Sequence, residues 1–159
     1  MKNKSIRFVA TAAVIAALYA ALTWVFQPIS FWAVQFRVSE ALCVLPFFTP
    51  AAIPGVTLGC LLGNLITGAA IWDVIFGTLA TLIGAVGSYL LRKNKWLVPI
   101  PPIVSNMIII PWVLRFAYGA EDAIPFMMLT VGIGEILAIY VLGMILLLAL
   151  EKAAPKLFG

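Results

Sequence analysis

The sequence predicts an all-α membrane protein, a bundle of six transmembrane helices that forms a single domain over residues 1–159. Hydrophobic residues make up 64% of the 159 residues and charged residues only 10%, and the mean hydropathy is +1.14. A soluble domain of this size needs far more polar surface. Long apolar runs recur between breakers and charged clusters along the whole chain, as spans separated by loops do.

The first apolar run follows a basic start and resembles a signal peptide. It continues to Phe26, which is far enough to cross a bilayer, so we expect a retained helix. The six predicted helices cover residues 5–26, 37–48, 51–67, 72–91, 97–118 and 124–152. The second and third are short, and "PFFTPAAIPG" between them fits either a tight turn or a broken helix.

Basic residues predict which side of the membrane the loops face. They form three clusters, at Lys2, Lys4 and Arg7, at Arg92, Lys93 and Lys95, and at Lys152 and Lys156. An even number of predicted spans separates each cluster from the next. Because basic loops stay on the cytoplasmic side, we expect both termini there. The links at residues 27–35, 68–73 and 119–123 then face outside.

Composition disfavours several classes of function. The chain has no histidine, and its two cysteines, Cys43 and Cys60, lie inside apolar runs. A metal site, or a serine or cysteine nucleophile, therefore lacks its usual ligands and base, and we expect no enzyme and no cofactor. A P-loop motif is also absent from the sequence. The net charge of +4 comes from the ends of spans, so we expect no nucleic-acid partner.

Two polar residues deep in apolar runs are candidates for a ligand site. A carboxylate near the bilayer centre costs about 3 kcal/mol on insertion scales. Glu135 lies at such a depth in the sixth predicted helix. We expect it to contact a ligand, although an ion pair or an interhelical hydrogen bond inside the bundle would also satisfy it. Asn106 lies at comparable depth in the fifth predicted helix and leaves the same two interpretations open.

The stretch "FRVSEALCVLPFF" places charges at the start of the second predicted helix. On a helix Arg37 and Glu40 share a face, so they form either a local ion pair at the outer interface or one wall of a pocket. Asp73 likewise fits a helix terminus favoured by the helix dipole or the same pocket. The predicted substrate-binding set is Glu40, Glu135, Asn106, Arg37, Gln35, Ser39, Trp72 and Asp73. Its carboxylates favour a cationic or donor-rich small molecule, and the link at residues 27–35 would cover the site as a lid.

Small residues form a stripe on the first predicted helix. Ala12, Ala16 and Ala20 recur every four residues, a spacing that lets another helix backbone approach closely. The approaching helix belongs either to this bundle or to a separate subunit.

Four segments resemble the QueT family of queuosine-precursor transporters: "FRVSEALCVLPFFTPAAIPG", "GNL", "WDVIFGTLATL" and "VGIGE". The resemblance extends over residues 19–152, and the F-R-x-S-E-A motif at 36–41 is its most specific part. Members of this family are S components, the substrate-binding subunits of energy-coupling factor (ECF) transporters. The resemblance implies the six-helix S-component bundle, in the cell membrane of a prokaryote. It also implies 7-aminomethyl-7-deazaguanine as the substrate.

The resemblance implies partners as well. These are a transmembrane coupling subunit, which would dock on Ala12, Ala16 and Ala20, and two cytoplasmic ATPase subunits. Glu40 and Glu135 would bind the N–H donors of the deazaguanine and the aminomethyl cation, with the assignment of the two left open. The alternative is a stand-alone oligomeric secondary transporter or channel for a small cationic solute. A structural subunit without a ligand fits less well, because it gives the buried Glu135 no role.

Overall fold

The computed structural model describes residues 2–30 and 35–159, and every regular element in that part of the chain is a helix. The elements are α1 (Lys2–Val25), α2 (Gln27–Ser30), the 3₁₀ helix η1 (Val38–Phe47), α3 (Ala52–Ile66), α4 (Ile71–Leu90), α5 (Ile100–Ala117), α6 (Ile124–Glu135), the π-helix η2 (Ile136–Gly143), α7 (Met144–Leu150) and α8 (Ala154–Phe158). Within the described residues, four segments are long and apolar enough to cross a membrane: Asn3–Val25, Ile71–Leu90, Ile100–Ala117 and Ile124–Leu150. The apolar helices η1 and α3 are shorter.

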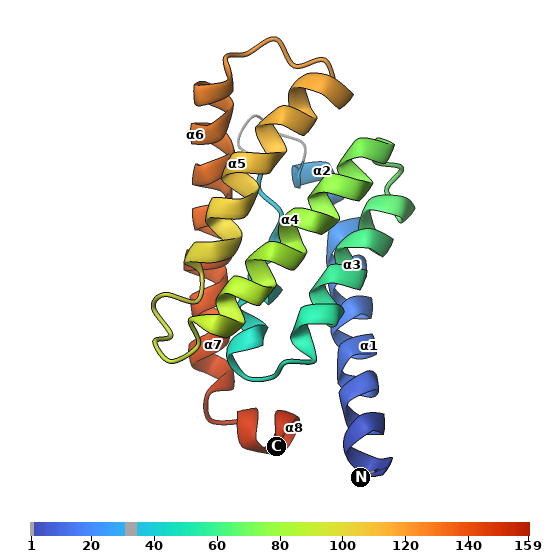
Figure 1. Cartoon of the computed structure of the whole chain (residues 1–159), viewed down its shortest axis with the longest axis vertical. Coiled ribbons are helices and arrows are strands. Elements are labelled where there is room, and N and C mark those ends of the chain that lie inside the picture. Colours follow the sequence, from blue (N-terminus) through green and yellow to red (C-terminus); the bar gives the residue numbers. More distant parts are fainter. Residues whose placement is uncertain (1, 31–34) are drawn as a thin grey trace.

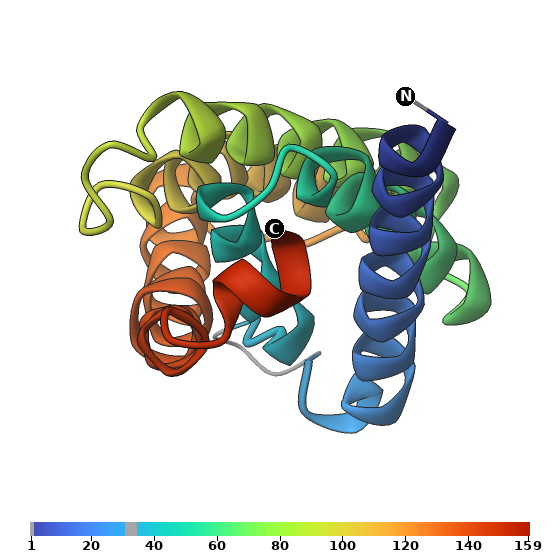
Figure 2. The same ribbon diagram turned by 90° about the horizontal axis from the view of Figure 1, so that it is seen from below.

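The helices alternate in direction along the long axis of the molecule (Figure 1). Helices α1, α3 and α5 run away from the end that carries both termini, and η1, α4 and the continuous α6–η2–α7 rod run back towards it. Seen along that axis, η1 lies in the middle of the longer helices (Figure 2). The side chains of η1 are therefore surrounded by the longer helices.

Basic and acidic segments lie at opposite ends of the bundle. The termini and the loop between α4 and α5, which hold the basic clusters, share one end, and the acidic loop between α5 and α6 lies at the other (Figure 1). Lys95 of the basic loop forms a 3.0 Å ion pair with Glu151, just after α7. The predicted distribution of basic loops therefore agrees with the way the chain folds.

The second predicted helix differs most from its expectation. Arg37 is extended, with φ −108° and ψ 109°, and the following ten residues form a 3₁₀ helix. At about 2 Å per residue, η1 covers roughly 20 Å of a hydrocarbon core that is about 30 Å thick. A short helix that ends at one surface must begin inside the bundle, and this carries Ser39 and Glu40 into the interior, where they are 1% and 2% exposed.

The proline-rich link between η1 and α3 is a tight turn rather than a broken helix. The amide of Ala52 donates to the carbonyl of Thr49 at 3.2 Å, and that of Ile53 donates to Pro50 at 3.1 Å. The turn lies at the end of the bundle that carries the termini (Figure 1). Of the two interpretations of "PFFTPAAIPG", the structure therefore selects the turn.

Helices α1 and α3 approach each other closely because α3 presents glycine. A Cβ atom added at Gly59 would lie 2.5 Å from the Cβ of Tyr19 and 3.0 Å from the carbonyl oxygen of Ala16. No larger residue fits there without separating the two helices. Tyr19, only 1% exposed, is held in place by this contact.

The alanine stripe faces this helix pair and not the surface. Ala12, Ala16 and Ala20 are 8%, 5% and 7% exposed. Docking of a separate subunit on these three side chains needs an exposed face, so their burial corrects that expectation in favour of packing inside the bundle. The neighbouring register, Ala13, Ala17 and Ala21, is exposed.

Candidate functional site

A small polar cavity lies inside the bundle where the segment before η1 meets η1, α4, α5 and α6. It is lined by Gln35, Arg37, Glu40, Gly77, Asn106, Ile110, Val131 and Glu135. Its volume, about 10 Å³, is enough for a single water molecule. Five of the eight predicted substrate-binding residues line this cavity: Gln35, Arg37, Glu40, Asn106 and Glu135.

Glu135 and Asn106 meet across two helices. The amide Nδ2 of Asn106 on α5 donates to Oε2 of Glu135, the last residue of α6, at 3.0 Å. Both side chains are buried, with exposed fractions of 3% for Asn106 and 5% for Glu135. The rod continues from Glu135 as the π-helix η2, a wide helical form that often occurs at functional sites.

Glu40 lines the same cavity from η1, and both of its oxygens accept hydrogen bonds. The hydroxyl of Tyr19 donates to Oε1. The thiol of Cys43 donates to Oε2 at 3.1 Å. Both donors are uncharged side chains, so Glu40 is hydrogen-bonded but has no counter-charge from them.

The ion pairs of the described residues leave the two glutamates of the cavity unpaired. These pairs are Arg37 with Asp73 and Lys95 with Glu151. Neither Glu40 nor Glu135 has a cationic side chain within ion-pair distance in that part of the chain. A buried carboxylate is costly without a cation or a set of donors. The cavity is therefore suited to a ligand that brings positive charge or N–H groups.

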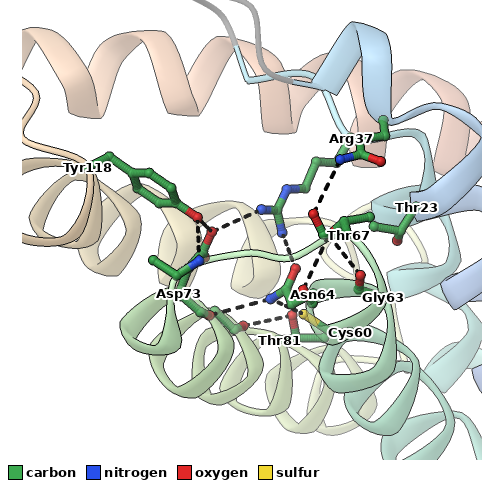
Figure 3. Close-up of polar contacts among 12 residues, drawn as sticks. Thr23, Arg37, Cys60, Gly63, Asn64, Thr67, Asp73, Thr81 and Tyr118 are labelled. Carbon is green, nitrogen blue, oxygen red and sulfur yellow. Dashed lines mark hydrogen bonds and ion pairs between the residues drawn. The ribbon is translucent and has the colours of Figure 1, made fainter.

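Arg37 forms an ion pair with a residue far away in the sequence. Its Nη2 lies 3.5 Å from Oδ2 of Asp73 on α4, and its Nη1 donates to Oδ1 of Asn64 on α3 at 3.4 Å (Figure 3). Of the two interpretations of Arg37 and Glu40, the local ion pair is absent because Arg37 is extended, so the two side chains do not share a helical face. The guanidinium instead joins the segment before η1 to two neighbouring helices.

Tyr118 completes this network from the end of α5. Its hydroxyl donates to Oδ2 of Asp73 at 2.8 Å and accepts from the backbone amide of Ala70 at 3.1 Å (Figure 3). Oδ1 of Asp73 is buried and has no hydrogen-bond partner among the described residues. The carboxylate of Asp73, a residue that is 4% exposed, thus binds both Arg37 and Tyr118 through a single oxygen at the start of α4.

Gly77 lines the cavity beside Asp73, where a residue without a side chain leaves room. A Cβ atom at Gly77 would lie 3.0 Å from Oδ1 of Asp73 and 3.2 Å from Nδ2 of Asn64. Any side chain at this position would crowd both polar groups and project into the space between them.

Three predicted substrate-binding residues do not line the cavity: Asp73, which lies beside Gly77, and Ser39 and Trp72. Ser39 accepts a 2.9 Å hydrogen bond from the hydroxyl of Thr23 and fastens η1 to α1. Trp72 is 53% exposed and stacks with Phe76, their ring centroids 6.0 Å apart. Both rings line an apolar groove on the surface of α4 and α5, together with Trp112. The ring of Trp72 therefore lies on the surface of the bundle and does not line the cavity.

The predicted lid is described at its two ends. It begins with α2 and ends at Gln35, which lines the cavity with a left-handed backbone of φ 48°. Gln27 donates through Nε2 to the carbonyl of Thr67 at 3.3 Å, which holds the start of the segment against the end of α3. Residues 31–34 lie outside the described part of the chain.

Three residues of the hydrogen-bond network, Asn64, Tyr19 and Tyr118, were not predicted from the sequence. Asn64 interrupts an apolar run just as Asn106 does, so the same cost of burial would have identified it. Tyr19 and Tyr118 carried no comparable signal, because tyrosines are common near the ends of membrane spans. Their roles depend on contacts with Glu40 and Asp73 that only the folded chain brings together.

Comparison with known proteins identifies the family. The model of the family described as "QueT transporter" matches residues 9–152. The chain belongs to the QueT transporter family. Together with its apolar helices, this membership makes it a multi-pass membrane protein of a transporter family.

A curated relative of this QueT chain is the queuosine precursor transporter QueT of Lactococcus lactis subsp. cremoris (strain MG1363). The two are 40% identical over 85 residues, which is 52% of this chain and 50% of the relative. The matched part therefore spans half of that relative. No solved structure matches the chain.

Proposed function

We propose that the chain is the substrate-binding subunit for a queuosine precursor, 7-aminomethyl-7-deazaguanine. The observation that carries the proposal is the pair of buried carboxylates, Glu40 and Glu135, which line one cavity without a paired cation in the described part of the chain. The name of the Lactococcus relative, a queuosine precursor transporter, supports the same ligand class.

The ligand complements the groups around the cavity. Its aminomethyl group is a cation that a carboxylate neutralises, and its ring presents N–H donors that carboxylate and amide oxygens accept. Arg37 and Gln35 add donors for the ring carbonyl. Because the ligand is far larger than a water molecule, binding requires the lining to separate. The segment Gln27–Gln35 is the element that would move, since its described part, α2 and Gln35, belongs to no long helix.

The remaining parts of the proposal concern the assembly. The six apolar helices act as one S-component bundle in the cytoplasmic membrane of a prokaryote, with both termini in the cytoplasm, where basic loops are favoured. A transmembrane coupling subunit and two cytoplasmic ATPases supply the energy that a chain without a P-loop does not generate.

The coupling subunit docks on the exposed alanines of α1, namely Ala13, Ala17 and Ala21, in place of the buried register. Small residues allow a partner helix to approach closely. A separate apolar groove of about 480 Å³ lies between other residues of α1, such as Val14 and Leu18, and Leu146 and Leu150 of α7.

Calorimetric titration of the purified protein tests the ligand. Wild-type protein should bind 7-aminomethyl-7-deazaguanine, and Glu40→Gln and Glu135→Gln should each weaken binding by roughly 10- to 100-fold, the value of a hydrogen bond to a charged group. Glu151→Gln is the matched control, because it removes a carboxylate in the exposed pair with Lys95 and leaves the cavity unchanged. Unchanged affinity in both cavity variants would refute the two-carboxylate site. Tight binding of a different vitamin would replace the ligand.

A further inference from the structure

The two carboxylates of the cavity are not equivalent. Both oxygens of Glu40 already accept a hydrogen bond from the protein, one from Tyr19 and one from Cys43. Glu135 accepts one bond, from Asn106 to Oε2. Its Oε1 has no donor among the described residues, yet it is not a buried orphan like Oδ1 of Asp73. The open acceptor of this pair of glutamates is therefore on Glu135.

Asn106 adds a second open acceptor next to the first. Its Nδ2 is used on Glu135, and in the described part of the chain its Oδ1 receives no hydrogen bond. An amide whose N–H points at a carboxylate leaves its own oxygen free for a ligand donor. Glu135 and Asn106 together thus present two acceptor oxygens, from two helices, to one cavity.

Glu40 differs in what it has left to offer. Each of its oxygens already accepts a bond from Tyr19 or Cys43, which are uncharged, and Arg37 is paired with Asp73. The negative charge of Glu40 therefore has no counter-charge in the described part of the chain. An ammonium group is a compact point charge that responds to a nearby carboxylate without a fixed hydrogen-bond geometry. The low dielectric of a buried site strengthens that attraction.

We infer that Glu135 and Asn106 read the N–H edge of the ligand ring, whereas Glu40 provides the counter-charge for the aminomethyl group. This division rests on the proposed function and assigns to each carboxylate the task for which it is free. Tyr19 is a positioning residue in this scheme, because it holds Glu40 towards the cavity from α1.

The reverse assignment crowds donors on Glu40. Each of its oxygens has a second lone pair, but a ring N–H group there would share the oxygen with Tyr19 or Cys43. Tyr19 is 1% exposed, so its hydroxyl cannot turn to solvent instead. The oxygens without a protein donor, Oε1 of Glu135 and Oδ1 of Asn106, would then serve the ammonium group alone.

Two ligands that differ only in charge separate the roles. Affinities of 7-aminomethyl-7-deazaguanine and of its neutral 7-methyl analogue would be measured by calorimetry on wild-type protein, Glu135→Gln, Glu40→Gln and Tyr19→Phe. Glu135→Gln should weaken both ligands by a similar factor of roughly 10- to 100-fold. Glu40→Gln should weaken the cationic ligand by such a factor and the neutral ligand by less than about 3-fold. Tyr19→Phe should reduce the preference for the cation and leave the affinity for the neutral ligand close to that of wild type.

Each outcome decides between the hypotheses. Equal losses for both ligands in Glu40→Gln, or a loss confined to the cationic ligand in Glu135→Gln, overturn the division of roles and leave the proposed function standing. Wild-type protein that binds neither deazaguanine overturns the proposed function and the division with it. If Glu135→Gln does not fold, Asn106→Ala takes its place, and it too must weaken the two ligands alike.

Discussion

The guanidinium of Arg37 lies 3.5 Å from the carboxylate of Asp73, although 36 positions separate the two residues in the sequence. This pair joins the extended segment before η1 to the first turn of α4, and Asn64 and Tyr118 bind to the same two side chains. This ion pair therefore holds the extended segment that follows the predicted lid beside the cavity.

Replacing Asp73 by Asn should destabilise the protein. The side chain of Arg37 is only 16% exposed, and the variant leaves its charge without a partner. Because the pair is long and not fully buried, we expect a loss of about 1–3 kcal/mol, below the range for fully buried pairs. Thermal unfolding in detergent, followed by tryptophan fluorescence, measures it. Glu151→Gln removes an exposed pair and should cost no more than about 1 kcal/mol. Equal shifts in the two variants would contradict a structural role for Arg37–Asp73.

The hydrogen bond from Tyr118 to Asp73 should make the stability of the protein depend on pH. Burial raises the pKa of Tyr118 above its usual value, and only the protonated phenol donates to Asp73. The stabilisation is therefore complete below the unfolded pKa of about 10 and is lost as the pH rises through the raised value. Tyr118→Phe should be less stable than wild type at about pH 8, and the difference should shrink towards about pH 11. Melting temperatures of both proteins across this range measure it, and a constant difference would exclude the hydrogen bond as its source.

The sequence predicted the positions of the long helices well because the length of each apolar run decides them. The predicted segment 72–91 corresponds to α4 at Ile71–Leu90, for example. The 3₁₀ form of η1 and the π-helix η2 were not predicted, since both depend on how the central helix packs among its neighbours. The docking stripe of α1 was assigned to the buried face for the same reason. Two alanine registers lie side by side in the sequence, and the packing of α1 against the glycines of α3, Gly55, Gly59 and Gly63, decides which of them is buried.

Residues of the candidate site were predictable where the residue type and its position in an apolar run were sufficient evidence. Glu135 and Asn106 are polar groups in apolar runs, and the cost of burying each one pointed to a shared cavity. The partners of Glu40 and Arg37 were not predictable. A local spacing of three residues suggested that they pair with each other, whereas the fold supplies Tyr19 and Asp73 from distant helices.

Gly59→Ala should loosen α1 from α3 and weaken ligand binding together. The new methyl group would lie 2.5 Å from the Cβ of Tyr19, so the helices must separate or Tyr19 must move away from Glu40. Overpacking of this kind costs about 1–3 kcal/mol. Thermal unfolding and ligand titration on the same sample measure both effects. Leu58→Ala, at a position that is 49% exposed on the same helix, is the control and should change neither by much. If the Gly59→Ala protein is destabilised but binds the ligand normally, Tyr19 does not contribute to the site.

Gly77→Ala should impair binding more than stability. Its methyl group would lie 3.0 Å from Asp73 and 3.2 Å from Asn64, contacts that small shifts relieve, but Gly77 lines the cavity and these shifts would reach its wall. We expect ligand affinity to fall roughly 10-fold, as for one misfitted methyl group in a pocket, with a stability change below about 1 kcal/mol. Calorimetry and thermal unfolding test this pair of effects. Ile83→Ala, 49% exposed on the same helix, should bind like wild type. Normal affinity of Gly77→Ala would place the ligand elsewhere.

Ala17→Trp should separate substrate binding from assembly. Ala17 is exposed on α1, on the register next to the buried one, so a bulky side chain there leaves the α1–α3 contact intact but blocks the close approach of a partner helix. Ligand affinity should remain within about 2-fold of wild type, while co-purification with the coupling subunit and ATPases from the native membrane should fall at least about 10-fold. Ile75→Trp, which adds the same bulk at a position 49% exposed on α4, should co-purify normally. Equal recovery of the ATPases with Ala17→Trp would move the docking surface away from these alanines. Failure of wild-type protein to recover any ATPase would favour a transporter that works alone.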